Sequence, residues 1–287
     1  MLNQYLKYLL KKDDNFISYW CALDEDSQVE YVNNLLAIES LYSGYDKVAL
    51  ISEISKKHEA IKRIFVKIPH INLSLFRIPD GWNSFIKNEN EKKKLFQLSN
   101  DMLSKHIQVY DLSDVCYLYG NIKSNASLDR KIMTDYMPNN SSGTRDIWDI
   151  IRFRMVASNL FDLLYIATTI WDEYYDNILK CYNYYSNPKN NDPLKHYRGI
   201  HFEIFLQPDK IVELQLVTKS VDSVSYIEHS VMFKKLLPFQ NNLQESWLKT
   251  FVLKSLLFDY NNLVESELIN KKLPLTSYIA KKSESGM

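Results

Sequence analysis

Two neighbouring stretches of the chain alternate between apolar and polar side chains over their central residues. In the first, "GIHFEIFLQ" at residues 199–207, the apolar positions are Ile200, Phe202, Ile204 and Leu206. After the turn residues "PDK", the stretch "IVELQLVT" has its apolar positions at Val212, Leu214 and Leu216. Because a period of two residues is the side-chain period of a β-strand, the pair predicts an antiparallel hairpin with one buried face.

The polar positions of this hairpin share the opposite face. They are His201, Glu203, Glu213 and Gln215. Such a face is either a binding site or an ordinary solvated surface with cross-strand pairs, and the hairpin alone leaves both interpretations open.

The remaining patterns predict helices around further strands. Residues 1–108 have helical periodicity, including one amphipathic stretch whose apolar side carries Val48, Ile51, Ile54, His58, Ile61 and Phe65. The later patterns predict a strand at 113–122, a helix at 127–137, a strand at 149–158, a helix at 159–178, a loop at 181–197, the hairpin, a helix at 219–236 and a helix at 243–269. This order favours an α+β fold with a mixed sheet, and it suggests a helical N-terminal region at 1–108, a central domain at 109–238 and a C-terminal helix with a polar tail at 239–287.

Composition limits the classes of function. Lysine plus arginine and aspartate plus glutamate both total 35, so the zero net charge provides no global attraction for nucleic acid or membrane. The three cysteines have no zinc-ligand or disulfide spacing, and we find neither a signal peptide nor an apolar run long enough to span a membrane. We therefore expect a cytoplasmic protein with reduced cysteines and no membrane contact.

Phosphate chemistry, if present, must use side chains and metal. Neither GxxxxGK[ST] nor GxGxxG occurs, which excludes the two common phosphate-binding loops. Asp149 opens the predicted strand "DIIRFR". Arg152 and Arg154 follow two residues apart, so their side chains point to the same face of that strand. An aspartate and a glutamate brought together from two strands can hold Mg²⁺, and arginines beside the metal would neutralise phosphate.

Five segments, taken in order, carry a resemblance to a known family. They are "GNIKSNASLDRKIM", "DIIRFRMV", "NPKNNDPLKHYRGIHFEI", "VELQLVT" and "YIEHSVMFK". Together they resemble the RelA/SpoT-family synthetase domain, whose motifs include D-[LI]-x-[GA]-[IV]-R and E-V-Q-[IL]-R-T in the same order. The resemblance covers roughly residues 113–236 and implies a nucleotidyltransferase-like synthetase domain in the central region.

The resemblance also implies an activity and a set of roles. Members transfer the β,γ-pyrophosphate of ATP to a ribose 3′-hydroxyl and release AMP. It implies Asp149 and Glu213 as catalytic and Mg²⁺-binding residues, Glu213 either completing the metal site or acting as base. The expected ATP-binding residues are Lys123, Ser127, Lys131 and Arg154. The expected acceptor-binding residues are Tyr197 and His201, with Gln215, Glu228, His229 and Lys234 in supporting positions.

This chain departs from the family pattern in four places, including the loop expected to bind the acceptor. Asn121 replaces an arginine, the acceptor loop is longer and has His196 in place of glycine, and Gly199 and Val217 replace a serine and an arginine. Arg152 has no arginine counterpart in the motif. The acceptor is therefore either GDP or GTP, as in alarmone synthesis, or the 3′ CCA end of tRNA, as in toxic relatives paired with an antitoxin protein. A catalytically silent nucleotide-binding module is a third hypothesis, and assembly into a homo-oligomer stays open.

Overall fold

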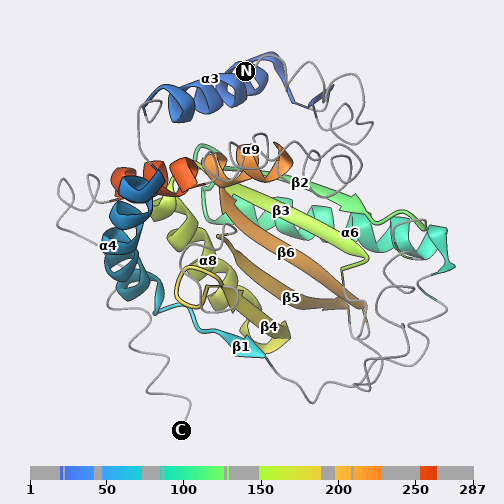
Figure 1. The fold of residues 1–287 in the computed structure, drawn as a ribbon. Helices are drawn as coiled ribbons and strands as arrows, with labels where there is room; N and C mark the ends of the chain where they lie inside the picture. Colours follow the sequence, from blue (N-terminus) through green and yellow to red (C-terminus); the bar gives the residue numbers. More distant parts are fainter. Residues whose placement is uncertain are drawn as a thin grey trace, which may run out of the picture.

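The centre of the protein is a mixed six-stranded sheet. The computed structural model describes residues 20–21, 23–41, 47–72, 85, 87–125, 128, 149–188, 198–207, 210–227 and 253–263 (Figure 1). The strands lie in the order β1-β4-β5-β6-β3-β2. Their bounds are β1 Ile71–Asn72, β2 Cys116–Ile122, β3 Ile151–Ala157, β4 Ile178–Asn183, β5 Ile200–Gln207 and β6 Lys210–Thr218. β3 and β6 pair in parallel, and the other neighbours pair antiparallel.

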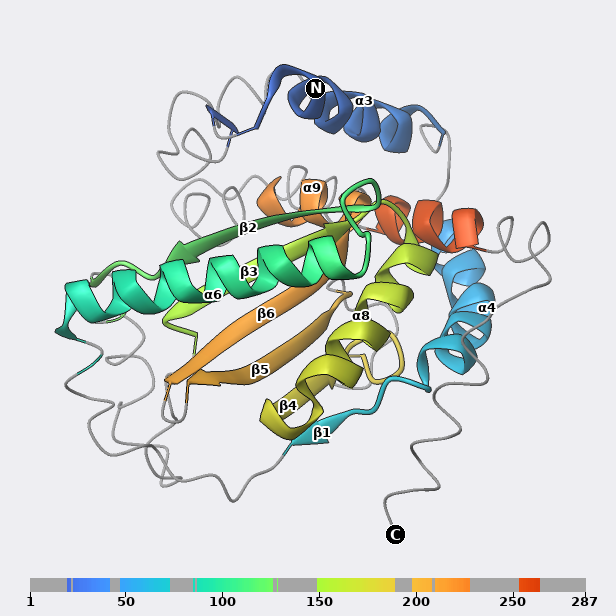
Figure 2. The ribbon, with the colours of Figure 1, turned by 180° about the vertical axis from the view of Figure 1, so that it is seen from behind.

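Two long helices cover one face of this sheet. They are α6, Glu89–Val109, and α8, Leu160–Tyr174, which lie across the strands in Figure 2. Each begins at an asparagine, Asn88 or Asn159, whose side chain accepts hydrogen bonds from backbone N–H groups of the first turn. η1, Tyr175–Asn177, then leads from α8 into β4.

The other helices lie around the edges of the sheet. α9, Lys219–Ile227, follows β6 directly, and α3, Glu25–Leu41, lies next to it (Figure 1). α4, Lys47–Phe65, lies beside the helical residues 253–263, where Nδ1 of His58 is 3.3 Å from the Tyr260 hydroxyl. These helices therefore frame the sheet at the end where β6 terminates.

The apolar face of the sheet packs against α6 and α8 to form the core. Phe153, Phe202 and Leu214 have no exposed surface, and Phe96 of α6 stacks on Phe153 with ring centroids 4.9 Å apart. A Cβ at Gly120 would lie 2.6 Å from the Phe153 ring, so a larger residue there would displace that ring. Close packing of this face fixes which side chains of the central strands point the other way.

The structure confirms the predicted hairpin, because β5 and β6 are antiparallel with Glu203 opposite Glu213 and His201 opposite Gln215. Other predictions were wrong. Residues 178–183 form β4 instead of the end of a helix and part of a loop, since strand pairing with β1 and β5 outweighs the local helical pattern. Val48 is 72% exposed, and Leu50 takes a buried position in α4 instead. The predicted helix at 127–137 and the end of the helix predicted for 219–236 fall largely outside the described residues.

One continuous hydrophobic core joins parts of the three predicted regions. It contains Ile54 and Leu95, the sheet residue Phe202, and Leu257 and Tyr260 of the C-terminal helix. The division at 108 and 238 stays a prediction. Within the described ranges, no helix is long and apolar enough to cross a membrane.

Candidate active site

Two rows of side chains cross the sheet on the face opposite α6 and α8. From β4 to β2, the first row consists of Lys180, Glu203, Glu213, Arg152 and Asn121. The second row consists of Tyr182, His201, Gln215, Arg154 and Tyr119. Directly opposed residues on paired strands share a face, so charged and aromatic groups from strands distant in sequence lie side by side.

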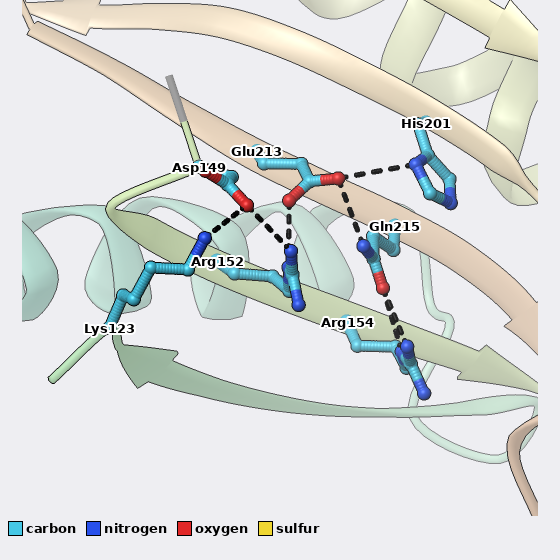
Figure 3. A network of polar contacts seen from close by, with 7 residues as sticks. All are labelled: Lys123, Asp149, Arg152, Arg154, His201, Glu213 and Gln215. Carbon is cyan, nitrogen blue, oxygen red and sulfur yellow. Dashed lines mark hydrogen bonds and ion pairs between the residues drawn. The ribbon is translucent and has the colours of Figure 1, made fainter. Parts of the chain in front are cut away.

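The guanidinium of Arg152 in the first row binds two carboxylates, Glu213 of the same row and Asp149, which lies just before β3 (Figure 3). Nε of Arg152 donates to Oε2 of Glu213 at 2.7 Å, and Nη2 donates to Oδ2 of Asp149 at 3.0 Å. The same Asp149 oxygen accepts from Nζ of Lys123, which follows β2. Asp149 precedes β3 and Glu213 lies within β6, so the parallel pairing of those strands brings the two carboxylates to a common cation.

The surroundings of Glu213 keep its carboxylate ionised. Burial alone would raise the pKa of Glu213, because the charged form loses hydration. The Arg152 guanidinium and hydrogen bonds from His201 and Gln215 outweigh burial, and the pKa lies well below its usual value. This carboxylate is therefore a strong anionic ligand and a weak proton acceptor.

His201 is a neutral hydrogen-bond donor to this carboxylate. Its Nδ1 lies 3.2 Å from Oε1 of Glu213. Burial lowers the pKa of His201, and the nearby arginines add to this effect against the opposing influence of Glu213. A neutral imidazole that donates from Nδ1 keeps the lone pair of Nε2, so its second nitrogen is an acceptor.

Arg154 lies in the second row, and Gln215 connects it to Glu213 of the first row. Its Nε and Nη2 donate to Oε1 of Gln215 at 3.1 and 2.6 Å, and its Nη1 donates to Oδ1 of Asp222 at 2.7 Å. The hydroxyls of Tyr117 and Tyr119 also donate to Asp222, whose side chain has no exposed surface. The guanidinium of Arg154 is thus bound by partners from β2, β6 and α9.

An aromatic group flanks the carboxylates on the β4 side. The rings of Tyr182 and Tyr184 are stacked with centroids 6.1 Å apart, and His201 meets Tyr184 edge-on at 5.2 Å. Burial raises the pKa of Tyr182 and of Tyr184 to about 12, so both remain neutral phenols. Nζ of Lys180 lies 3.0 Å from Oε2 of Glu203 beside them.

The described structure brings together half of the predicted site. Residues that lie within one connected group are Lys123, Asp149, Arg154, His201, Glu213 and Gln215 (Figure 3). Predicted residues that fall outside the described ranges are Ser127, Lys131, Tyr197, Glu228, His229 and Lys234. The roles of all twelve stay predictions.

Sequence reasoning missed several members of this group. The family motif gave Arg152 no counterpart and no role, yet Arg152 joins the two predicted metal ligands. Sequence reasoning also missed Asp222 and Tyr119, the partners of Arg154. The alternation in "CYLYGNI" places Tyr117 and Tyr119 on one side of the strand, which was a usable signal for the tyrosines. No comparable local pattern marks Asp222.

The acidic pair has the ligand chemistry of a magnesium site. Both groups supply carboxylate oxygens, and both turn toward one cationic centre, which in this structure is the guanidinium edge of Arg152. Among the described residues, no cluster of three or more histidine, cysteine, aspartate or glutamate side chains is arranged to hold a metal. Mg²⁺ keeps several waters and phosphate oxygens as ligands and needs only one or two carboxylates, so the two carboxylates of the pair match the ligand preference of this ion.

Comparison with protein families decides the relationship. Residues 120–236 match the family model described as "Region found in RelA / SpoT proteins". This region is a RelA/SpoT-family domain. It contains β3 to β6, both carboxylates of the acidic pair, and Arg152 and Arg154.

Solved structures of other proteins share the fold of this chain over about two thirds of its length. Small alarmone synthetase 1 from Bacillus subtilis matches with a TM-score of 0.52 and 17% identity, over 67% of this chain and 100% of that one. Small alarmone synthetase 2 from the same organism matches with a TM-score of 0.50 and 20% identity, over 66% and 100%. A GTP pyrophosphokinase family protein from Streptococcus pneumoniae matches with a TM-score of 0.52 and 17% identity, over 67% and 96%. No curated protein sequence matches the chain.

Proposed function

We propose that this chain transfers the β,γ-pyrophosphate of ATP to the ribose 3′-hydroxyl of GDP or GTP. The observation that carries the proposal is the pair of carboxylates, Asp149 and Glu213, set beside Arg152 and Lys123 within a RelA/SpoT-family domain. Pyrophosphoryl transfer needs an aligned hydroxyl, cations where negative charge accumulates and ligands for a metal. The names of the similar structures, two alarmone synthetases and a GTP pyrophosphokinase family protein, support the same reaction class.

Asp149 and Glu213 are the described residues that would hold Mg²⁺. When bound, such an ion neutralises the phosphate oxygens and orients them for in-line attack. The charged side chains around them are already balanced, since Lys123, Arg152, Arg154 and Lys180 pair with Asp149, Glu213, Asp222 and Glu203. The described part of the site therefore needs an additional cation to accept a triphosphate.

The pKa of Glu213 bears on its role. A carboxylate whose pKa is held well below its usual value takes a proton from a ribose hydroxyl poorly. Glu213 is thus better suited to metal binding than to proton abstraction. His201, neutral and oriented by Glu213, is the described group beside it that can accept a hydrogen bond from the hydroxyl.

The acceptor base would stack on the aromatic side of the site. Tyr182 and Tyr184 lie next to His201, and stacking of a base on such rings contributes about 1–3 kcal/mol without strong choice of base. A tRNA acceptor has less support, because Lys92 of the basic run 92–94 is buried and pairs with Glu89 at 2.6 Å. Lys93 and Lys94 of the same run are exposed, as are Lys56, Lys62 and Arg63 of α4. tRNA therefore stays in the experiment as the alternative acceptor.

One assay distinguishes these functions. The protein is incubated with Mg²⁺ and γ-labelled ATP together with GDP, GTP or deacylated tRNA in parallel. We expect label on GDP or GTP and release of AMP. Label on the 3′ end of tRNA alone would identify the toxin-like activity, which an antitoxin would need to restrain. No AMP with any acceptor would contradict the enzyme and leave a silent nucleotide-binding module.

A further inference from the structure

Arg152 occupies the place between Asp149 and Glu213 that a bridging cation would take. Its Nε and Nη2 groups, which lie along one edge of the planar guanidinium, each donate to a different carboxylate. The motif that "DIIRFR" resembles has glycine or alanine at this position, so a long cationic side chain here is a feature of this chain. Figure 3 shows the guanidinium between the two carboxylates, with Arg154 turned toward Gln215 instead.

The guanidinium and a metal bridging the same oxygens exclude each other. Oε2 of Glu213 and Oδ2 of Asp149 lie 2.7 and 3.0 Å from Arg152 nitrogens. Mg²⁺ binds carboxylate oxygens at about 2.0–2.1 Å. An ion at that distance from both oxygens would lie against the guanidinium edge, where two positive charges repel within about 4 Å.

Charge balance leads to the same conclusion. Among the described residues, Arg152 and Lys123 together balance the charge of Asp149 and Glu213, and Asp149 offers one oxygen to both cations. A divalent ion that entered this group unchanged would meet no net negative charge. Metal binding therefore requires one of the internal cations to leave, and Arg152, with 34% of its side chain exposed, has open solvent on one side.

We propose that Arg152 is an internal counter-cation that competes with a divalent metal ion for Asp149 and Glu213 and so weakens metal binding in the nucleotide-free protein. A phosphate group offers the guanidinium an alternative bidentate partner. Movement of Arg152 to a bound phosphate would free the carboxylates, and metal and triphosphate binding would then favour each other reciprocally. This inference rests on the metal role proposed for the acidic pair.

Direct metal titration without nucleotide tests the competition. Mn²⁺ serves as a spectroscopically visible substitute for Mg²⁺, and the free ion is counted by electron paramagnetic resonance. We expect Arg152→Ala to bind Mn²⁺ roughly 10-fold or more tightly than the wild type, a ratio within the usual range of coupling between two sites. Arg152→Gln, which also removes the charge but keeps a polar side chain, should change in the same direction.

Two control variants separate competition from general electrostatics. Lys180→Ala removes a cation from the same sheet face, but the Lys180 ammonium pairs with Glu203, so its Mn²⁺ affinity should change less than about threefold. Arg152→Ala combined with Glu213→Gln should lose the gain, because one of the two freed carboxylates is gone. Thermal unfolding of each variant, followed by circular dichroism, checks that the fold is retained.

The outcomes are distinct from those of the transfer assay. Equal or weaker Mn²⁺ binding by Arg152→Ala and Arg152→Gln would overturn the inference and make Arg152 a support that holds the carboxylates in place. An equal gain in Lys180→Ala, or a gain that survives Glu213→Gln, would overturn it as well. If the wild type transferred no pyrophosphate while both Arg152 variants gained Mn²⁺ affinity, the competition would stand and only the proposed function would fail.

Discussion

Arg152 and Arg154 leave the same strand on the same face, yet their surroundings differ. Arg152 is 34% exposed and holds two carboxylates that each keep other partners, Lys123 for Asp149 and His201 for Glu213. Arg154 is 11% exposed, and its carboxylate partner Asp222 has no exposed side-chain surface. An arginine at the solvent edge can exchange partners at low cost, whereas one that neutralises a buried carboxylate is part of the folded core.

The largest expected effect comes from the buried arginine. Arg154→Met should lower the free energy of unfolding by about 3–5 kcal/mol, because it leaves the Asp222 carboxylate buried without its guanidinium. Urea denaturation measures the change. Arg154→Met combined with Asp222→Asn should recover a large part of the loss, and a single variant as stable as the wild type would remove the distinction between the two arginines.

A smaller effect, on activity, is expected at the carboxylates that bind Arg152. Glu213→Gln should reduce transfer by about 10²-fold or more, since it removes one proposed metal ligand but keeps the shape of the side chain. Labelled-ATP turnover measures it, with Asp149→Asn as a second variant that should behave alike. Near-normal turnover in either, with the fold intact, would mean that the metal site lies elsewhere.

Asp259 is a second buried acid to compare with Asp222. It accepts a hydrogen bond of 2.6 Å from the hydroxyl of Thr218, at the end of β6. Burial raises the pKa of Asp259 to about 7, against hydrogen bonds from Thr218 and Ser220 that lower it. The folded protein then keeps this proton up to about pH 7, while the unfolded chain loses it near pH 4. Stability from this group is full below pH 4 and is lost as the pH rises through 7.

Asp259→Asn therefore removes a pH-dependent cost. The free energy of unfolding of the variant, relative to that of the wild type, should rise by about 2 kcal/mol as the pH is raised from 5 to 8. Denaturant unfolding at both pH values tests this. A constant difference across the range would indicate that Asp259 is ionised in the folded state.

The smallest expected effect is on the stability of an Arg152 variant. Arg152→Met should cost about 1 kcal/mol or less, because both carboxylates keep partners and water reaches the group. The same urea titration used for Arg154→Met gives the direct comparison. A cost above about 3 kcal/mol would place Arg152 among the structural ion pairs, and its exchange with a metal would then be unfavourable.

Local patterns predicted the parts of the fold that depend on neighbouring residues. The alternation at 199–218 predicted the hairpin and the shared face of His201 and Glu213. β4 was missed because residues 178–183 read as a continuation of α8 and a loop, and only pairing with β1 and β5 makes them a strand. Asp222 was missed because its partner Arg154 is contributed by another element, 68 residues away in sequence.

The amino-acid sequence by itself determined which side chains alternate to the polar face, because the period of a strand is a local property of the backbone. It did not determine which cation meets which carboxylate. Arg152 and Glu213 are 61 residues apart and meet only because β3 and β6 pair in parallel in one register, which the packing of their apolar faces against α6 and α8 holds in place. Arg152 and Arg154 are two positions on one short strand, and only the tertiary structure makes their burial and their partners different.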